Sequence, residues 1–434
     1  MNKSKSPITS KAGILAQLEF IKKINLDEHL ESISVEKNLE RVYSFHDVLK
    51  MITIGITAGA KSLLSVVAAW NDKVLAEVAN IQRIPDDSTM GRILKRSNLG
   101  IINDLERIPS ILRDKALLSY LTPKTAQINC RREIIIDIDA THHASYGQQE
   151  GSVKGYNITK KGGNCYQSLL AFDSFSKTLM LGWLRAGNTN GINGFCDFID
   201  QLKAIYPQEK SFVRCDSGFF SGDTLDKLES HNMSYLIKAR LKNIDRITRH
   251  DDWASVPGKP GKKGWQQLTF EYSCAGWKKS RKFYAVRIKV DQIEEKNGLF
   301  EPEDMIIEKY LYFCYVCTKG LSPWTTHCLY KPRAVCENYI EELKNQMGLG
   351  KMKSRDFNAT SVMFHCCILA YNLLRWMTIC SGKSRLFKWE MSHIRCFLIC
   401  VAGKLIRTGR QIFVEIDDQH LYQEELDAWL SFCT

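Results

Sequence analysis

The spacing of apolar positions predicts a chain that begins with helices. Residues 1–130 show mostly helical periodicity, and a long apolar run starts behind the sequence SFHD at residues 44–47, which resembles a helix capping box. The most apolar early stretch, residues 51–70, contains Lys61 and several glycines and serines. We therefore expect a buried helix there and not a membrane span.

A second helix start lies at residues 85–88, where the sequence is PDDS. Arg92, Lys95 and Arg96 lie on the short helix that follows it. Basic residues on a short helix behind a turn are typical of a DNA recognition helix, and the solvated face of a structural helix has the same pattern. The hypothesis for residues 1–130 is a helical N-terminal DNA-binding region.

The middle of the chain changes to strand patterns. Apolar or alternating runs predict strands at RREIIIDIDAT (131–141), CYQSLLAFD (165–173), KTLMLGWLRAG (177–187), SFVRCDSGF (211–219) and SYLIKAR (234–240). Helices are expected at about 191–204 and 222–231. Three strands, a helix, and then alternating strands and helices predict an α+β fold, with a mixed sheet flanked by helices.

Residues 241–317 interrupt this pattern with a basic, β-rich insertion. A long apolar helix, residues 360–377, follows later, and the last residues form short amphipathic pieces. The predicted regions are a helical N-terminal part (1–130), a core in two parts (131–240 and 318–380), the insertion between them (241–317) and a helical C-terminal part (381–434).

The overall charge and the cysteine content narrow the class of protein. A net charge of +12 favours a polyanionic partner, although a merely basic protein has the same balance. The 15 cysteines are odd in number and have no short repeat, which predicts reduced thiols in a cytosolic compartment. Because the N-terminus has no apolar core after its charges, we expect no secretory signal, no membrane and a cytoplasmic location.

Carboxylates end two of the predicted strands. Asp137 and Asp139 share one face of the first strand because side chains alternate, and Asp216 ends the strand SFVRC. Either Asp137 or Asp139 could be the functional acid. A buried carboxylate is costly unless it is paired, solvated or bound to a metal.

The sequence YKPRAVCENYIEELK brings a further acid and two cations onto one helical face. At about 100° per residue, Arg333, Glu337 and Lys344 fall within about 40° of each other, and Tyr330 lies close by. Glu341 lies one turn beyond Glu337 and is the alternative acid. Arg and Lys bind phosphate oxygens, and a carboxylate binds a metal ion.

Three converging carboxylates would require a cation between them. At about 4 Å and an effective dielectric of about 20, each pair would repel by roughly 4 kcal/mol. Oxygen ligands favour Mg²⁺ or Mn²⁺, and two such ions can activate a water or a 3′-hydroxyl and stabilise a leaving oxygen. The sequence therefore suggests metal-dependent chemistry on a phosphodiester.

Other motifs suggest zinc or a phosphate loop, but each has a simpler interpretation. Adjacent histidines, His142 and His143, point to opposite sides of extended backbone, and so do Cys314 and Cys317 if they lie on a strand. Neither pair is well placed to share one ion. Residues 348–351, with the sequence GLGK, lack the full phosphate-loop spacing, so we interpret them as the end of a helix.

In combination, these motifs resemble those of a bacterial insertion-sequence transposase of the DDE class. The matching residues are Asp139 in IDAT, Asp216 in RCDSGF, and the series Tyr330, Arg333, Glu337 and Lys344, which resembles the YREK signature. The stretch YGQQE at residues 146–150 resembles one subgroup of that family. The resemblance covers roughly residues 85–380.

The resemblance implies an RNase H-like catalytic core and cut-and-paste transposition. Asp139, Asp216 and Glu337 would be the metal ligands for two Mg²⁺ ions, with Mn²⁺ as a substitute. The other positions implied or suggested to contact DNA are Tyr330, Arg333, Lys344, Lys351 and Lys353. A tryptophan of the insertion can stack on a flipped base in such proteins, and the candidates are Trp253, Trp265 and Trp277.

Further expectations concern the partners and the rival functions. The resemblance implies double-stranded DNA as partner, both element ends and target, a homodimer or larger synaptic complex, and association with the bacterial nucleoid. One alternative function is a catalytically silent DNA-binding protein derived from a transposase, and another is a general RNase H-like nuclease. End cleavage, binding without nicking, or cleavage of arbitrary duplexes would distinguish the three.

Overall fold

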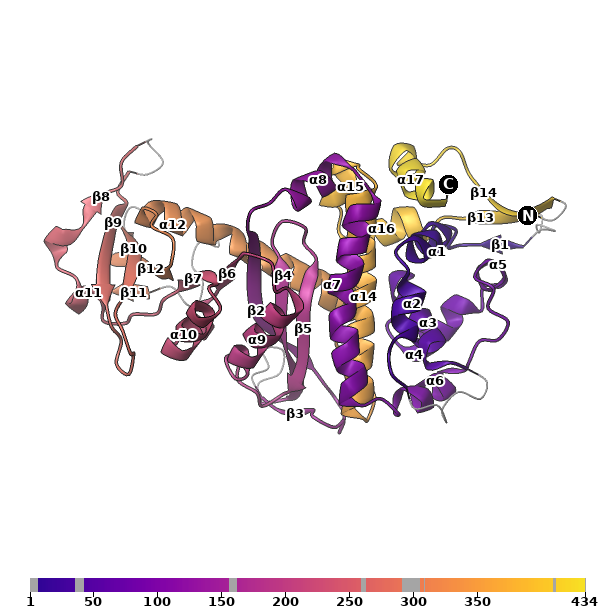
Figure 1. Cartoon of the computed structure of the whole chain (residues 1–434), viewed down its shortest axis with the longest axis horizontal. Helices are drawn as coiled ribbons and strands as arrows, with labels where there is room; N and C mark the ends of the chain where they lie inside the picture. The colour runs from indigo at the N-terminus through magenta and orange to yellow at the C-terminus, as the bar shows by residue number, and fades with distance from the viewer. Residues whose placement is uncertain are drawn as a thin grey trace.

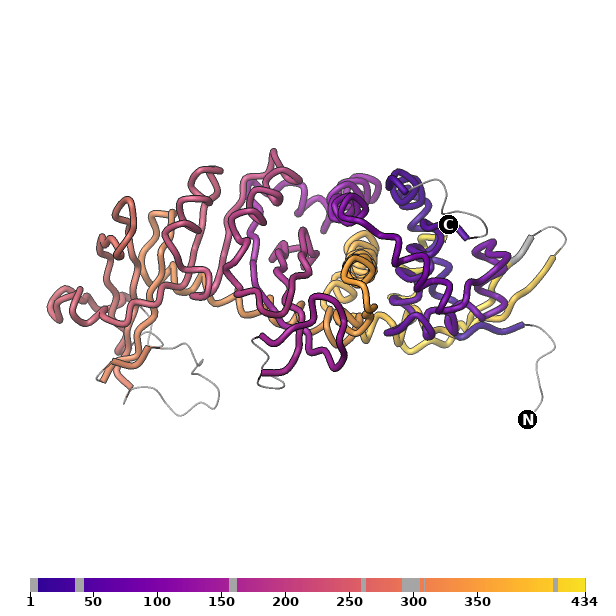
Figure 2. Tube along the Cα trace, turned by 90° about the horizontal axis from the view of Figure 1, so that it is seen from below, coloured from indigo at the N-terminus to yellow at the C-terminus, as the bar shows by residue number. Residues whose placement is uncertain are grey.

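A mixed sheet, which has eleven strands over the residues that the structure describes, runs through one half of the molecule. The computed structural model describes residues 7–35, 43–155, 162–258, 263–290, 305–307, 309–408 and 411–433. In Figure 1 the sheet extends from the left end to the centre, where two long helices, α7 (Leu99–Ser119) and α14 (Phe357–Cys380), separate it from a mainly helical part. The view from below in Figure 2 shows the same elongated outline.

Five strands form the centre of the sheet, and all five were predicted from the sequence. They are β2 (Ile134–Ala144), β4 (Asn164–Asp173), β5 (Leu179–Ala186), β6 (Ser211–Cys215) and β7 (Ser234–Lys238). Their order is β5-β4-β2-β6-β7. The β2–β4 and β4–β5 pairs are antiparallel, whereas β2–β6 and β6–β7 are parallel. A short strand, β3 (Val153–Lys154), adds to β4.

Helices cover both faces of this central part. On one face lie α9 (Phe195–Ile205) and α10 (Gly222–Ser230), and on the other lie α12 (Pro323–Tyr330), α13 (Val335–Glu341) and α14. Along β2, Ile134, Ile136 and Ile138 enter the core under α9 and α10. Alternation turns Asp137 and Asp139 to the opposite face, toward α12 and α13.

The β-rich insertion continues the central sheet. It consists of α11 (Ile244–Ile247), β8 (Ala254–Ser255), β9 (Gln266–Tyr272), β10 (Arg281–Lys289), β11 (Met305–Ile307) and β12 (Tyr310–Cys317). β12 pairs antiparallel with β7, with Tyr315 opposite Lys238 and Cys317 opposite Leu236. The insertion is β-rich as predicted, and its strands share backbone hydrogen bonds with the core.

The N-terminal part is helical, as its apolar periodicity predicted. Before α7 lie α1 (Ile14–Lys23), α2 (Leu26–Glu31), α3 (Phe45–Thr57), α4 (Leu63–Trp70), α5 (Lys73–Val78) and α6 (Asp87–Leu94), and α8 (Pro123–Asn129) follows it. Ser44 caps α3 by accepting a hydrogen bond of 2.9 Å from the Asp47 amide. The helices α1 to α7 share one hydrophobic core with α14 and the C-terminal part, while Ile128 of α8 packs in a smaller cluster with Leu117 and Ile379.

The C-terminal part contains a hairpin besides the predicted helices. Its elements are α15 (Ser384–Lys388), α16 (Met391–Ile394), β13 (Gly403–Thr408), β14 (Gln411–Ile416) and α17 (Gln423–Leu430). β13 pairs with β14 and with β1 (Ile8–Thr9), which makes a small sheet at the right of Figure 1. The helical prediction for residues 381–434 was therefore incomplete.

Within the part of the chain that the structure describes, one helix has the length and composition to cross a membrane. This helix is α14, and its most apolar window is entirely buried inside the protein. In Figure 1 it lies against α7 between the sheet and the N-terminal helices, where it serves as the central core helix.

Candidate active site

The ends of two parallel strands bring Asp139 and Asp216 together. Asp216 directly follows β6, and Cys215 at the end of β6 pairs with Ile138 of β2. Both carboxylates reach the same guanidinium: Arg333 Nη2 lies 3.0 Å from Asp139 Oδ2 and 3.8 Å from Asp216 Oδ2. The sequence predicted that Asp139, Asp216 and Glu337 converge. The structure brings Asp139 and Asp216 to one guanidinium, and among the described residues it arranges no three acids as a metal site.

Arg333 is the buried centre of this cluster. Its side chain is only 8% exposed, and Nε and Nη2 make no well-aligned hydrogen bond within the described residues. The contact with Asp139 is therefore an ion pair that leaves buried donors unsatisfied. Burial alone would lower the pKa of Arg333, but its anionic neighbours, above all Asp139, raise it. Such donors suit an additional acceptor such as a phosphate oxygen.

Glu337 is the third acid near this cluster. It lies exposed on α13, one turn after Arg333. Burial raises the pKa of Asp139, Arg333 opposes that rise, and the charge of Glu337 adds to it. Glu341, the alternative acid, instead accepts hydrogen bonds from Asn345 (3.1 Å) and Gln346 (3.2 Å). These contacts favour Glu337 over Glu341.

Asp137 has a structural role. Its two oxygens accept hydrogen bonds of 2.6 and 2.7 Å from Nε and Nη2 of Arg214, and both side chains are almost fully buried. Arg214 also donates to the carbonyl of Leu329 at the end of α12. The pair thus ties β2 and β6 to the helix that leads into the site. Because its oxygens are already bonded, Asp137 is a poor choice of ligand, which leaves Asp139.

The 100° spacing assumed one regular helix for the residues that resemble the YREK signature. The structure instead places them on a segment whose helix type changes. The segment changes from α12 through a 3-10 turn (Lys331–Ala334) into α13 and then into a π-helical turn (Glu342–Gln346). Despite these changes of phase, the Lys344 ammonium lies 3.1 Å from Thr141 Oγ1, two residues after Asp139. The Tyr330 ring packs on Tyr315 with ring centroids 5.0 Å apart.

The sheet separates the three tryptophans of the insertion. Trp253 is buried against Arg287, and Trp277 packs on Phe283; both belong to the core on the α9–α10 face. Trp265 is half-buried on the opposite face, the one that carries Asp139, and packs against Trp324 of α12 with centroids 5.2 Å apart. Trp324 is an aromatic that the sequence analysis missed.

A row of contacts runs from Trp265 toward the acids. We call Trp265, His327, Tyr315 and Tyr330 the aromatic row. The Trp265 and His327 rings lie 5.5 Å apart, His327 Nδ1 shares a hydrogen bond of 2.8 Å with the Tyr315 hydroxyl, and Tyr315 packs on Tyr330. Burial lowers the pKa of His327 to about 3, so its ring is neutral. The row ends at Tyr330, which interacts with Arg333.

The remaining basic candidates lie in two separate places. Lys351 and Lys353 follow the π-helical turn, and Lys353 donates to the carbonyl of Ala144, the last residue of β2. Arg92, Lys95 and Arg96 are exposed at the end of α6, beyond the α7–α14 pair in Figure 1. The fold therefore places only the first group beside the acids.

The zinc hypotheses find no support in the placement of their residues. Cys314 belongs to the core under α9 and α10, and Cys317 to the cluster on the opposite face. His143 is buried and contacts Ser168 Oγ at 2.8 Å. Among the described residues, no three His, Cys, Asp or Glu side chains are arranged to hold a metal, and the Asp139 carboxylate is engaged by Arg333.

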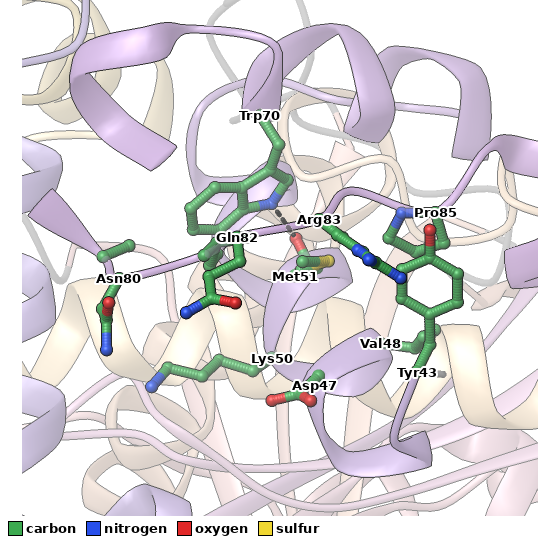
Figure 3. A pocket seen from close by; sticks show the side chains of 12 residues that line it. Tyr43, Asp47, Val48, Lys50, Met51, Trp70, Asn80, Gln82, Arg83 and Pro85 are labelled. Carbon is green, nitrogen blue, oxygen red and sulfur yellow. Dashed lines mark hydrogen bonds between the residues drawn. The ribbon is translucent and has the colours of Figure 1, made fainter. Parts of the chain in front are cut away.

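A separate cavity of about 500 Å³ lies among the N-terminal helices. In Figure 3 its wall contains Asp47 together with Lys50 and Arg83, and Asn80 and Gln82 project from the segment behind α5. The indole of Trp70 donates a hydrogen bond of 2.9 Å to the Met51 carbonyl at its back. Since acid and cations face one another there, the cavity has no strong preference for an anion.

Comparisons with known proteins identify the family. The family Transposase DDE domain group 1 matches residues 2–432, so the chain belongs to this family of DDE transposases. No curated protein matches the sequence. A piggyBac transposase in a synaptic complex with hairpin DNA is a similar solved structure, with 12% identity and a TM-score of 0.43 over 91% of this chain and 83% of that chain. The family implies a metal-dependent transposase that cleaves DNA.

Proposed function

We propose that the chain is the transposase of a bacterial insertion sequence, of the group with the YREK signature, and that it moves DNA by cut-and-paste. The main support is the meeting of Asp139 and Asp216 at the ends of β2 and β6, with Glu337 and Arg333 beside them. The strand order β5-β4-β2-β6-β7, antiparallel on one side of β2 and parallel on the other, supports an RNase H-like core.

Asp139, Asp216 and Glu337 would hold the divalent metal that the family implies. Three carboxylates are hard oxygen donors, which suit Mg²⁺ or Mn²⁺. In the structure, the guanidinium of Arg333 supplies the positive charge between Asp139 and Asp216. When bound, two ions would activate a water or 3′-hydroxyl and stabilise the leaving oxygen of the phosphodiester.

The other residues of the site would bind and orient the DNA. Arg333 offers free donors to a phosphate once a metal takes its place between the acids, and Lys344 contacts Thr141, two residues after Asp139. Trp265 and Trp324 offer partly exposed rings on the face that carries Asp139, which suits stacking with an unpaired base. The basic end of α6 would contact duplex DNA farther from the cut, and at least two copies would join the two element ends.

The direct test is cleavage of DNA that carries the sequences flanking the gene. With Mg²⁺ we expect the purified full-length protein to cut at the element ends and to join the 3′-OH ends to target DNA, and with a chelator we expect no cut. Cleavage of arbitrary duplexes without joining would instead indicate a general nuclease. End binding without any nick, at any metal concentration, would indicate a silent DNA-binding protein.

Replacing Arg333 with Gln should strengthen metal binding while it weakens DNA binding. The guanidinium competes with a metal for Asp139 and Asp216, and its removal leaves two uncompensated carboxylates. We expect the apparent Kd for Mn²⁺ to fall about tenfold, seen as a larger rise in Tm at a given Mn²⁺ concentration. Lys344→Gln is the matched control, because it removes a nearby charge that pairs with neither acid. Equal Mn²⁺ affinity in all three proteins would contradict the competition.

A further inference from the structure

An open cavity of about 1050 Å³ lies at the end of β2, the strand that carries Asp139. One wall is the end of β2 and the loop after it, from His142 to Gln149, and the other is the segment from Lys344 to Lys353. Cavities of this size hold ligands much larger than a single phosphate. The Lys344–Thr141 hydrogen bond connects its inner end to the strand that carries Asp139.

The charge of this cavity is positive and uncompensated. Lys344, Lys351 and Lys353 line it, and no Asp or Glu does. None of the ion pairs found between described residues involves any of these lysines. Burial lowers the pKa of Lys344, and lowers the pKa of Lys353 to about 8. Cations that are both crowded and partly removed from water gain most from an anionic ligand.

The wall that carries the lysines is held in a defined shape. Gly350 has φ +76°, and a Cβ there would lie 2.5 Å from Nδ1 of the buried His143. Only glycine allows the backbone to approach the imidazole this closely. Burial keeps the pKa of His143 well below its ordinary value, so the ring forms a neutral floor. The GLGK sequence that resembled a phosphate loop thus positions Lys351 at the cavity.

The mouth of the cavity carries an exposed aromatic ring. Tyr146 is 86% exposed, and it makes no ring contact with the other described residues. A cationic groove beside an exposed aromatic is the arrangement that proteins use for single-stranded nucleic acid, because phosphates bind the cations and an unpaired base stacks on the ring. A base-paired strand would not offer its base face to Tyr146.

We infer that this cavity binds the unpaired nucleotides that adjoin the scissile phosphodiester, with their phosphates on Lys344, Lys351 and Lys353 and one base on Tyr146. The inference rests on the proposed function for the adjoining acids. It assigns to the loop after β2 the binding of unpaired nucleotides at an opened DNA end, which is separate from recognition of the duplex.

Binding of two DNA ends that differ only in an overhang tests the inference. The full-length protein is titrated without divalent cations against an end duplex that is blunt or has several unpaired nucleotides. We expect the overhang to raise wild-type affinity about tenfold and Tyr146→Ala to remove most of that gain, whereas Tyr146→Phe keeps it. Lys351→Ala should also make the negative slope of log affinity against log salt shallower by about 0.7 for the overhang substrate, because one phosphate contact is lost.

A control variant separates this cavity from general electrostatics. Lys404→Ala removes an exposed charge on β13 and should leave the overhang gain unchanged. Equal gain in wild type, Tyr146→Ala and Lys351→Ala would overturn the inference. Competition by free thymidine monophosphate at the concentration of the overhang DNA would also overturn it, in favour of a free-nucleotide site.

The outcomes also distinguish the cavity from the proposed function. If no DNA is cleaved under any condition but the overhang gain still depends on Tyr146 and Lys351, the proposed function fails and the cavity stands. If end cleavage occurs and the wild type shows no overhang gain, the cavity fails and the proposed function stands. Since Tyr146 and Lys351 are exposed, their variants should melt at the wild-type temperature, which confirms that any loss is local.

Discussion

Asp139→Asn, Asp216→Asn and Glu337→Gln should each reduce end cleavage by at least about 1,000-fold, because a metal supplies several kcal/mol of transition-state stabilisation that needs all its ligands. Each change removes one anionic oxygen donor and keeps the size of the side chain. Binding of end DNA should persist, since Lys344 and the basic residues remain. The measurement is the rate of strand cleavage in Mg²⁺, with binding followed separately in its absence.

Glu341→Gln is the matched control for this series. Glu341 lies on α13 one turn after Glu337, is exposed like it, and is engaged by Asn345 and Gln346. We expect the Glu341→Gln variant to cleave end DNA at the wild-type rate. Full activity of Glu337→Gln, or loss of activity in Glu341→Gln alone, would show that the third acid has been assigned wrongly.

Arg214→Met should lower the free energy of unfolding by about 3–5 kcal/mol, because it removes the cation that hydrogen-bonds the buried Asp137 carboxylate. Asp137 and Arg214 are 1% and 2% exposed, and three hydrogen bonds connect Arg214 to Asp137 and to Leu329. The double change Asp137→Leu with Arg214→Met should recover most of the loss, since no charge then stays buried. Urea unfolding followed by tryptophan fluorescence measures both.

An exposed pair of the same length is the natural comparison. Lys22 and Glu19 also lie 2.6 Å apart, but their side chains are 63% and 42% exposed. Water screens such a pair, so Lys22→Met should cost less than about 1 kcal/mol. Similar losses for the two variants would mean that burial does not set the strength of the Asp137–Arg214 pair.

The positions of the acids at the strand ends were predictable because they follow from the local alternation of side chains along each strand. Alternation along RREIIIDIDAT places Asp137 and Asp139 on one face, and parallel neighbours end at the same edge, so Asp139 and Asp216 meet. Which of Asp137 and Asp139 is available could not be decided from the sequence. That depends on Arg214, a residue 77 positions away whose side chain donates two hydrogen bonds to Asp137.

The helical segment was harder to predict because its period changes. The sequence suggested one face for Tyr330, Arg333, Glu337 and Lys344, yet Pro332 lies in a 3-10 turn and a π-helical turn follows α13. Arg333 therefore turns inward to the acids. The tryptophans posed a different difficulty: the face of each depends on the register of β9, β10 and β12, which one sequence does not reveal.

The C-terminal hairpin did leave a signal that the analysis missed. Leu405 to Thr408 and Gln411 to Ile416 are two short β-prone runs joined by Gly-Arg, and a two-residue link that begins with glycine is typical of a tight hairpin. The sequence analysis had described these residues only as short amphipathic pieces of a helical C-terminal region. Trp324, in contrast, gave no signal apart from its position just before the YREK-like series.

The pairing of β12 with β7 fixes how far the aromatic row stands from the acids. Asp216 follows Cys215, which pairs with Ile237, and Ile237 pairs with Val316 of β12. Two ladders of hydrogen bonds thus join the insertion to the strand ends that carry Asp139 and Asp216 and hold it in place. If DNA binds across this surface as proposed, we expect the DNA helix, which is the more pliable body, to bend to fit it.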